Sequence, residues 1–265
     1  MLHTQVKGLS VAYQRAGSGP ALVLLHGFTL DSRSWRPQIA GLSDRFTVIA
    51  WDAPGAGQSQ DPPATFGIGD WADALAGLLD SAGIQRAHVV GLSWGGLLAQ
   101  EFYRRYPSHV ISLVLADTYA GWKGSLPAPL PDQRLDAAIK DSLLSPGEFV
   151  QKYLPGMFGD AAAPEIRKEL GDIMAEFHPA GFRLMATALA KADTREFLST
   201  IKVPTLLIWG DADKRAPLDA GRAIRDAIPA ARLEIIPGAG HLSNLERAAE
   251  FNTMVRDFCL SVPPQ

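Results

Sequence analysis

The segment 89–96, with the sequence VVGLSWGG, constrains the fold of this chain more than any other stretch. The short apolar run that leads into it predicts a buried strand, and the apolar spacing that follows predicts a helix. A Gly-x-Ser-x-Gly motif at this junction places Ser93 in a sharp turn, with a strained backbone and a hydroxyl that projects above the sheet. Gly91 and Gly95 lack the side chains that would collide in so tight a turn. We interpret Ser93 as a nucleophile; an ordinary Gly/Ser turn is the alternative.

Length and composition predict a soluble globular protein. The 265 residues are 47% hydrophobic and 20% charged, which allows a large core and excludes a disordered chain. A net charge of −3 gives no polybasic surface for nucleic acid or an anionic membrane. The single cysteine, Cys259, excludes an internal disulfide and a cysteine-based zinc site, and we expect it to pack in the interior. Residues 1–13 do not resemble a signal peptide, and no apolar run is long enough for a membrane span. We expect a cytoplasmic protein and leave its oligomeric state open.

Strand and helix signals alternate along the first 117 residues, after a β-hairpin at 2–15. Short apolar strands that alternate with helices predict an α/β fold with a mostly parallel central sheet and helices on both faces. In such sheets ligands bind outside the carboxyl ends of the strands, and His26, Asp52, Ser93 and Asp117 all follow strand ends. The expected strands are 21–25, 46–51, 87–90 and 110–116, and the expected helices are 35–42, 68–82 and 97–106.

The alternation breaks between 118 and 200, where no buried strand is evident. We interpret this segment as a helical cap domain, or lid, inserted after the sixth strand, and 1–117 with 201–265 as the core domain. The cap begins with a Gly- and Pro-rich stretch, and its expected helices are 133–144, 146–154, 163–177 and 180–191. The core then resumes with strands at 203–209 and 233–236 and helices at 218–228 and 248–260.

A serine hydroxyl needs a base to remove its proton, and the base needs a carboxylate to orient it. His241 is the predicted base, because it lies in a Gly-rich loop between the last strand and the last helix. We expect His88 to pack inside its strand and His26 to shape the loop after the first parallel strand. His178 lies in the cap, where it could contact a substrate.

Asp213 is the predicted carboxylate, because it follows a strand directly. Asp211 is interpreted as a turn former, and Asp117, which also ends a strand, could reach the same histidine. The order Ser93, Asp213, His241 matches the chain order expected for a nucleophile on such a turn.

Two backbone amides are predicted to form an oxyanion hole, those of Phe28 and Trp94. This set of residues requires neither a metal nor another cofactor. Apolar and adaptable side chains of the cap are candidates for a substrate pocket, although most of them could simply pack the cap helices together. The candidates are Trp122, Phe177, His178 and Met185, followed by Met157, Phe158, Met174 and Phe182. A substrate carboxylate could bind Arg183, Lys191 or Arg195, for which surface salt bridges are the alternative.

Five motifs together resemble the α/β-hydrolase fold family, over nearly the whole chain. The resemblance implies a serine–acid–histidine triad under a helical lid, and a structural role for Asp52 in the turn after its strand. The motifs are His26-Gly27-Phe28, the loop 52–59, GLSWGG at 91–96, Gly210-x-x-Asp213-x-x-x-Pro217 and Gly238-x-Gly240-His241.

Within that family, the sequence is most similar to 3-oxoadipate enol-lactonases and related carboxylesterases, on residues 91–96 and 113–118. Asp117 stands where an enol-lactonase is expected to have asparagine. Ser93 differs from the aspartate of haloalkane dehalogenases and epoxide hydrolases, and the loop after His26 lacks the Gly-Gly-Pro-Gly run of proline iminopeptidases and the Gly-Pro-Gly-Ala stretch of carbon–carbon bond hydrolases. The resemblance implies a cofactor-independent serine hydrolase that acts on a small-molecule carboxylic ester or lactone. The alternatives are a carbon–carbon bond hydrolase, a perhydrolase, an amidase or a non-enzymatic small-ligand sensor.

Overall fold

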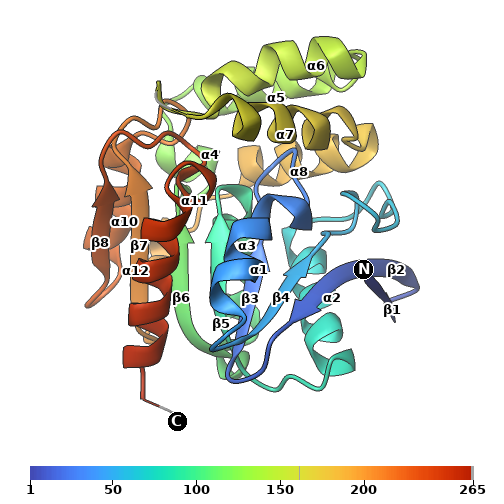
Figure 1. The fold of residues 1–265 in the computed structure, drawn as a ribbon. Coiled ribbons are helices and arrows are strands. Elements are labelled where there is room, and N and C mark those ends of the chain that lie inside the picture. Colours follow the sequence, from blue (N-terminus) through green and yellow to red (C-terminus); the bar gives the residue numbers. More distant parts are fainter. Residues whose placement is uncertain (161, 264–265) are drawn as a thin grey trace.

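A computed structural model describes residues 1–160 and 162–263, and these form one eight-stranded sheet with helices on both faces (Figure 1). The sheet order is β1-β2-β4-β3-β5-β6-β7-β8. β1 and β2 form an antiparallel hairpin, β2 pairs antiparallel with β4, and all other neighbours are parallel. The strands are β1 Leu2–Val6, β2 Leu9–Ala16, β3 Ala21–Leu25, β4 Thr47–Trp51, β5 Ala87–Leu92, β6 Val110–Ala116, β7 Thr205–Gly210 and β8 Arg232–Ile236.

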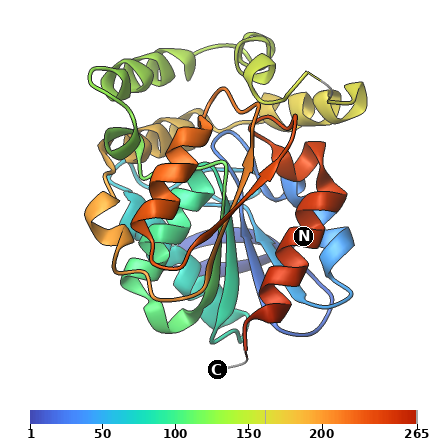
Figure 2. The same cartoon turned by 90° about the vertical axis from the view of Figure 1, so that its left-hand side faces the viewer.

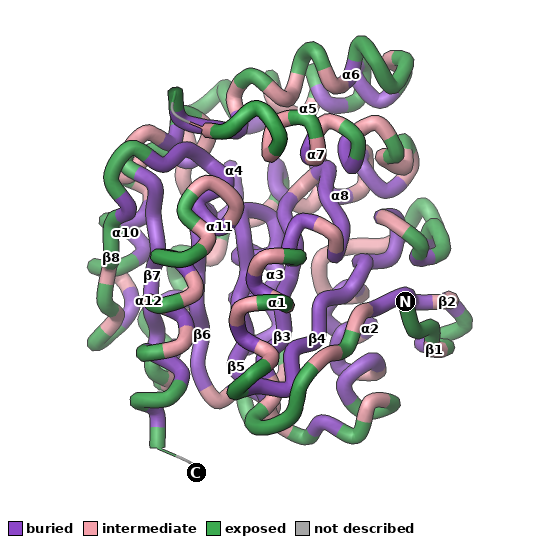
Figure 3. Tube along the Cα trace, in the orientation of Figure 1, coloured by how far each residue is buried: buried purple, intermediate pink, exposed green. Residues whose placement is uncertain are grey.

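The central strands are buried on both faces, as their continuous apolar sequences predict (Figure 3). Successive side chains of β3 enter opposite layers: Leu22 and Leu24 join one hydrophobic cluster, and Val23 and Leu25 join the other. The mostly parallel central sheet that was predicted from the alternation of strands and helices is therefore confirmed. Cys259 is buried, as expected.

Each face of the sheet is covered by its own helices. α1 Arg36–Leu42 packs with α12 Ala248–Ser261, and α2 Ile68–Ser81 packs with α3 Trp94–Arg105. Figure 2 looks from the β8 edge and shows the red α12 on one side of the sheet and the orange α10 Leu218–Ala227 on the other. α11 Ser243–Glu246 is a single helical turn before α12. It is too short to show an apolar periodicity in the sequence, so it was not predicted.

Between β6 and β7 the regular elements of the described residues are all helices, joined by loops, and Figure 1 shows α5 to α8 stacked over one end of the sheet. This confirms the helical segment inserted after the sixth strand, whereas its division from the core as a separate domain stays a prediction. The short helices α4 and α9 were not predicted. The elements are α4 Trp122–Ser125, α5 Leu130–Asp141, α6 Pro146–Tyr153, α7 Pro164–Ala175, α8 Pro179–Lys191 and α9 Arg195–Leu198. None of the described helices is long and apolar enough to cross a bilayer.

Candidate active site

Ser93 lies in the turn between β5 and α3, with a positive φ of 54° and a ψ of −116°. A Cβ at Gly91 would lie 2.3 Å from the carbonyl oxygen of Gly95, and a Cβ at Gly95 would lie 2.1 Å from that of Leu25. Side chains at either position would therefore collide with backbone, as the sequence predicts. The backbone NH of Ser93 donates to Ala116 O at 2.9 Å, which ties the turn to β6. The strained conformation of Ser93 is thus fixed by neighbouring strands.

Three of the predicted residues meet at this turn. His241 Nε2 lies 2.9 Å from Ser93 Oγ, and His241 Nδ1 lies 2.8 Å from Asp213 Oδ2. All three are buried. The other oxygen of Asp213 accepts from the amides of Arg215 and Ala216 at 2.7 and 3.0 Å, which orients the carboxylate. An imidazole that donates Nδ1–H to a carboxylate has its Nε2 lone pair free to accept the serine proton.

The two other aspartates near His241 have different partners. Asp117 Oδ1 accepts from Gly210 N at 2.9 Å, and Asp117 Oδ2 accepts from Ser243 Oγ at 2.6 Å. Burial, together with the negative charge of Asp213, raises the pKa of Asp117 well above its usual range. Asp211 Oδ1 accepts at 2.6 Å from the amide of Gly238, in the loop after β8, so this bond joins two loops and does not close the turn at Asp211. The hydrogen bond to His241 is therefore made by Asp213.

The loop after β3 lies against Ser93, since a Cβ at Gly27 would be 3.5 Å from Ser93 Cβ. His26 shapes this loop: its Nδ1 donates to Gly27 O at 2.9 Å, and its Nε2 accepts from Ala53 N at 3.0 Å. Burial lowers the pKa of His26, which favours the neutral ring that these two bonds require. Among the described residues, neither the Phe28 amide nor the Trp94 amide donates to a protein acceptor, so both are available to an oxyanion.

Asp52 holds the neighbouring turn together. Its two carboxylate oxygens accept from the amides of Ser32 and Gln58, each at 2.8 Å. These bonds agree with the structural role that the resemblance implies for Asp52 in the turn after its strand.

A cavity of about 40 Å³ opens beside Ser93 and His241. Two of the predicted cap residues, Trp122 and Met157, line it. The lining also contains five side chains that the sequence patterns did not indicate, although one lies inside the motif at 210–217 and another directly follows His241: Tyr119, Arg134, Leu189, Arg215 and Leu242. The full lining is Gly27, Phe28, Leu30, Ser93, Tyr119, Trp122, Arg134, Met157, Leu189, Arg215, His241 and Leu242.

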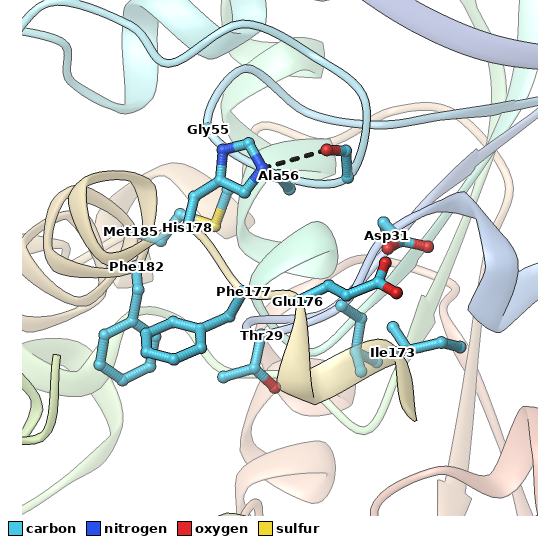
Figure 4. Close-up of a pocket in the computed structure, with 12 residues that line it drawn as sticks. Thr29, Asp31, Gly55, Ala56, Ile173, Glu176, Phe177, His178, Phe182 and Met185 are labelled. Carbon is cyan, nitrogen blue, oxygen red and sulfur yellow. Dashed lines mark hydrogen bonds between the residues drawn. The ribbon is translucent and has the colours of Figure 1, made fainter. Parts of the chain in front are cut away.

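Three other predicted pocket residues, Phe177, His178 and Met185, line a neighbouring small pocket instead, which does not include Ser93 (Figure 4). His178 faces the loop after β4, where its Nδ1 lies 2.6 Å from Asp61 Oδ1 and its Nε2 lies 3.0 Å from Gly57 O. Phe177 is covered by the ring of Phe149, with centroids 3.8 Å apart. The expected placement of these three side chains at the serine is therefore corrected.

The cationic candidates from the cap also lie elsewhere. Arg183 donates to Ser142 Oγ at 3.1 Å, and Arg195 forms an ion pair with Asp193 at 2.6 Å. Neither these arginines nor Lys191 lines the cavity at Ser93. The described residues also contain no group of three or more His, Cys, Asp or Glu side chains arranged to hold a metal ion.

Comparisons with known proteins agree with this architecture. A family described as alpha/beta hydrolase fold matches residues 20–248. The chain is 35% identical over 267 residues to a 2-hydroxy-6-oxononadienedioate/2-hydroxy-6-oxononatrienedioate hydrolase of Burkholderia vietnamiensis, covering 94% of this chain and 91% of that protein. It is 29% identical over 265 residues to 3-oxoadipate enol-lactonase 1 of Acinetobacter baylyi, covering 97% and 95%. An esterase structure from Thermogutta terrifontis superposes with a TM-score of 0.90 at 28% identity, covering 98% of this chain and 97% of that one.

The chain therefore belongs to the α/β-hydrolase fold family. It is a hydrolase whose relatives include an enol-lactonase and an esterase, which confirms the resemblance stated from the motifs.

Proposed function

We propose that the protein is a serine hydrolase that cleaves a carboxylic ester or lactone through an acyl-enzyme on Ser93. The observation that carries this proposal is the continuous hydrogen-bonded chain from Asp213 through His241 to Ser93. The free amides of Phe28 and Trp94 lie on the two segments that meet at the serine. A nucleophile, a base, an orienting carboxylate and oxyanion donors are the parts that acyl transfer needs.

In the proposed reaction, His241 Nε2 removes the proton of Ser93 Oγ while the oxygen attacks the carbonyl carbon. The amides of Phe28 and Trp94 stabilise the oxyanion of the tetrahedral intermediate. Its collapse breaks the carbon–oxygen bond, and His241 gives the proton to the departing alkoxide. Water then adds to the acyl-enzyme by the same steps, which releases the acid and restores Ser93. With a lactone, the alcohol stays attached to the acyl group.

The enol-lactonase and esterase relatives support the cleavage of a carbon–oxygen bond. The hydrolase of Burkholderia vietnamiensis, at 35% identity, supports a second candidate, hydrolysis of a carbon–carbon bond beside a carbonyl. The same serine chemistry serves both reactions, so analysis of the products distinguishes them.

A p-nitrophenyl ester series from acetate to decanoate tests the proposal with wild type and Ser93→Ala side by side. We expect wild type to hydrolyse at least one chain length, and Ser93→Ala to lose about a thousandfold or more in kcat. Asp213→Asn should lose a similar factor, because the amide favours the wrong tautomer of His241. Asp117→Asn is the matched control, since Asp117 makes no bond to His241, and it should keep kcat within about tenfold.

Equal slow rates for wild type and Ser93→Ala would remove Ser93 as an esterase nucleophile. Lactones, then vinylogous diketones with product analysis, would be assayed next to separate the lactonase from the carbon–carbon hydrolase.

A further inference from the structure

Two arginines face the cavity of Ser93 from different elements, Arg134 from α5 and Arg215 from the loop after β7. Arg134 donates to the hydroxyl of Tyr119 at 3.0 Å, and its guanidinium lies over the rings of Tyr119 and Trp122, 5.9 and 5.6 Å from their centroids. These contacts hold the Arg134 guanidinium in place with neutral groups.

Arg215 is also held by neutral groups. Its Nε donates to Gly156 O at 3.1 Å, an Nη donates to Tyr153 O, and the guanidinium lies 5.5 Å from the ring centroid of Tyr153. The carboxylate of Asp213 is nearby, but its oxygens accept from His241 and from backbone amides. Burial is the main cause that lowers the pKa of Arg215; the negative charge of Asp213 acts in the opposite direction, and the positive charge of Arg134 adds to the lowering.

Most other arginines of the described chain behave differently, since they form ion pairs with aspartate or glutamate side chains. Arg33, Arg36, Arg104, Arg105, Arg195, Arg222, Arg225 and Arg256 each have such a partner within 2.8 Å. A partly buried cation that makes only neutral contacts keeps capacity for an anion. Within the described residues, Arg134 and Arg215 combine this capacity with a place beside Ser93.

A second cavity, of about 290 Å³, adjoins the first and shares Phe28, Trp122 and both arginines with it. Its wall adds Lys152 and Lys214. The one carboxylate in its lining, Asp141, binds Lys152 Nζ at 2.6 Å and the hydroxyl of Tyr153 at 2.9 Å. The lining is therefore cationic, although the whole chain carries a net charge of −3. Such a field concentrates anions at the approach to the serine.

We propose that Arg134 and Arg215 bind a free carboxylate of the substrate, so that the protein acts on short esters or lactones that carry a second, ionised carboxyl group. This inference rests on the proposed function. The planar guanidinium of Arg134 can give a carboxylate two parallel hydrogen bonds, whereas Arg215, whose Nε and one Nη donate to backbone carbonyls, has its other Nη left to donate. The small volume beside Ser93 favours a short spacer between the scissile carbonyl and that carboxylate, as in a succinate or glutarate half-ester.

The structure also offers an alternative site, which would suit a substrate with an uncharged acyl chain. Arg134 and Tyr119 border a third cavity, of about 630 Å³, whose lining is mainly apolar. If that cavity received the acyl chain, long neutral esters would be preferred, and the arginines would not select the substrate.

Two esters of matched length distinguish these possibilities: mono-p-nitrophenyl glutarate, which ends in a carboxylate, and p-nitrophenyl pentanoate, which ends in a methyl group. The readout is the ratio of their kcat/KM values. We expect the ratio to exceed about ten in wild type and to fall by about tenfold to a hundredfold in Arg134→Gln, the range of a hydrogen bond to a charged group. Arg134→Lys should retain part of the ratio, because it keeps the charge but loses the fork.

Arg183→Gln is the matched control, because Arg183 is a cap arginine that binds Ser142 outside the cavity. It should leave the ratio unchanged. A second experiment uses the wild-type protein alone and so does not depend on the folding of any variant. Free glutarate should inhibit the hydrolysis of p-nitrophenyl pentanoate competitively, whereas pentane-1,5-diol should not inhibit it. Added NaCl should weaken the inhibition by glutarate, because salt screens the attraction between the carboxylates and the arginines.

A wild-type preference for pentanoate or decanoate over the glutarate ester would overturn the carboxylate site. So would an unchanged ratio in Arg134→Gln, or a glutarate effect equal to that of the diol. These results differ from failure of the proposed function, in which wild type hydrolyses both esters no faster than Ser93→Ala does.

Discussion

His88 lies inside β5, five positions before Ser93, and is 4% exposed. Its Nδ1 lies 2.7 Å from Ser112 Oγ on the neighbouring strand β6. Burial lowers the pKa of His88 from 6.5 to about 4, because the imidazolium would lose its hydration inside the sheet. The expectation that His88 packs within its strand is therefore correct.

This shift predicts an acid-dependent loss of stability. Between pH 6.5 and about 4 the unfolded chain binds a proton at His88 that the folded chain does not. The stabilising effect is thus complete above pH 6.5 and is lost as the pH falls toward 4, and it amounts to roughly 3 kcal/mol. His88→Gln should show a correspondingly smaller fall in the free energy of unfolding between pH 7.5 and 4.5, measured with urea. The control is His3→Gln, at an exposed position of β1; equal falls in wild type and His88→Gln would contradict the prediction.

At the scale of elements, the loop that carries the Phe28 amide is braced by a cap helix. The ring of Phe28 stacks on that of Phe182 in α8, with centroids 4.4 Å apart and planes 13° from parallel. Phe182 in turn meets the ring of Phe149 edge-on at 5.1 Å. The position of one proposed oxyanion donor therefore depends on packing within the cap.

Phe182→Ala should lower kcat for an ester by roughly tenfold to a hundredfold, since a displaced donor no longer faces the oxyanion. It should also cost about 3–5 kcal/mol of stability. Phe149→Ala is the matched control, because it removes a buried ring from the same cluster without touching Phe28 and should leave kcat within a few-fold. Steady-state kinetics and urea unfolding measure both effects. Equal losses of kcat in the two variants would show that the ring of Phe182 has no particular relation to the loop.

The elements that could be predicted are those whose signals are local. The turn at Ser93, the Asp213 turn and the His241 loop each follow a strand, and parallel strands bring their carboxyl ends to one edge. Their juxtaposition therefore follows from short motifs and strand order.

The cavity lining could not be predicted in the same way, because it depends on how each cap helix is rotated and seated. Met185 and Leu189 are one turn apart on the same buried face of α8, yet only Leu189 lines the cavity at Ser93. The place of Arg134 in the lining could not be predicted either, because a charged residue on an amphipathic helix is expected to face solvent. A difference of one helical turn, about 5.4 Å, decides which side chain reaches the serine.

At the scale of the whole molecule, the cap and the sheet share their hydrophobic clusters. Met185 and Leu189 of α8 belong to the same buried cluster as Trp71 and Leu97 on the face covered by α2 and α3. Phe149 of α6 belongs to the cluster on the opposite face. The predicted boundary separates a core from a cap, but apolar packing runs continuously across that boundary.

Shared clusters predict that cap and core unfold together. Exposing the apolar side of the cap would also expose its partners on the sheet, so a state with only the cap unfolded would lose stabilisation from both. Hydrogen exchange at increasing urea, read by mass spectrometry, should show peptides of α5 to α8 and of β5 to β7 opening at the same midpoint. Phe149→Ala should shift both sets of peptides equally, although its side chain lies in the cap. If the cap peptides opened at lower urea while the sheet stayed protected, 118–200 would instead be an independent folding unit.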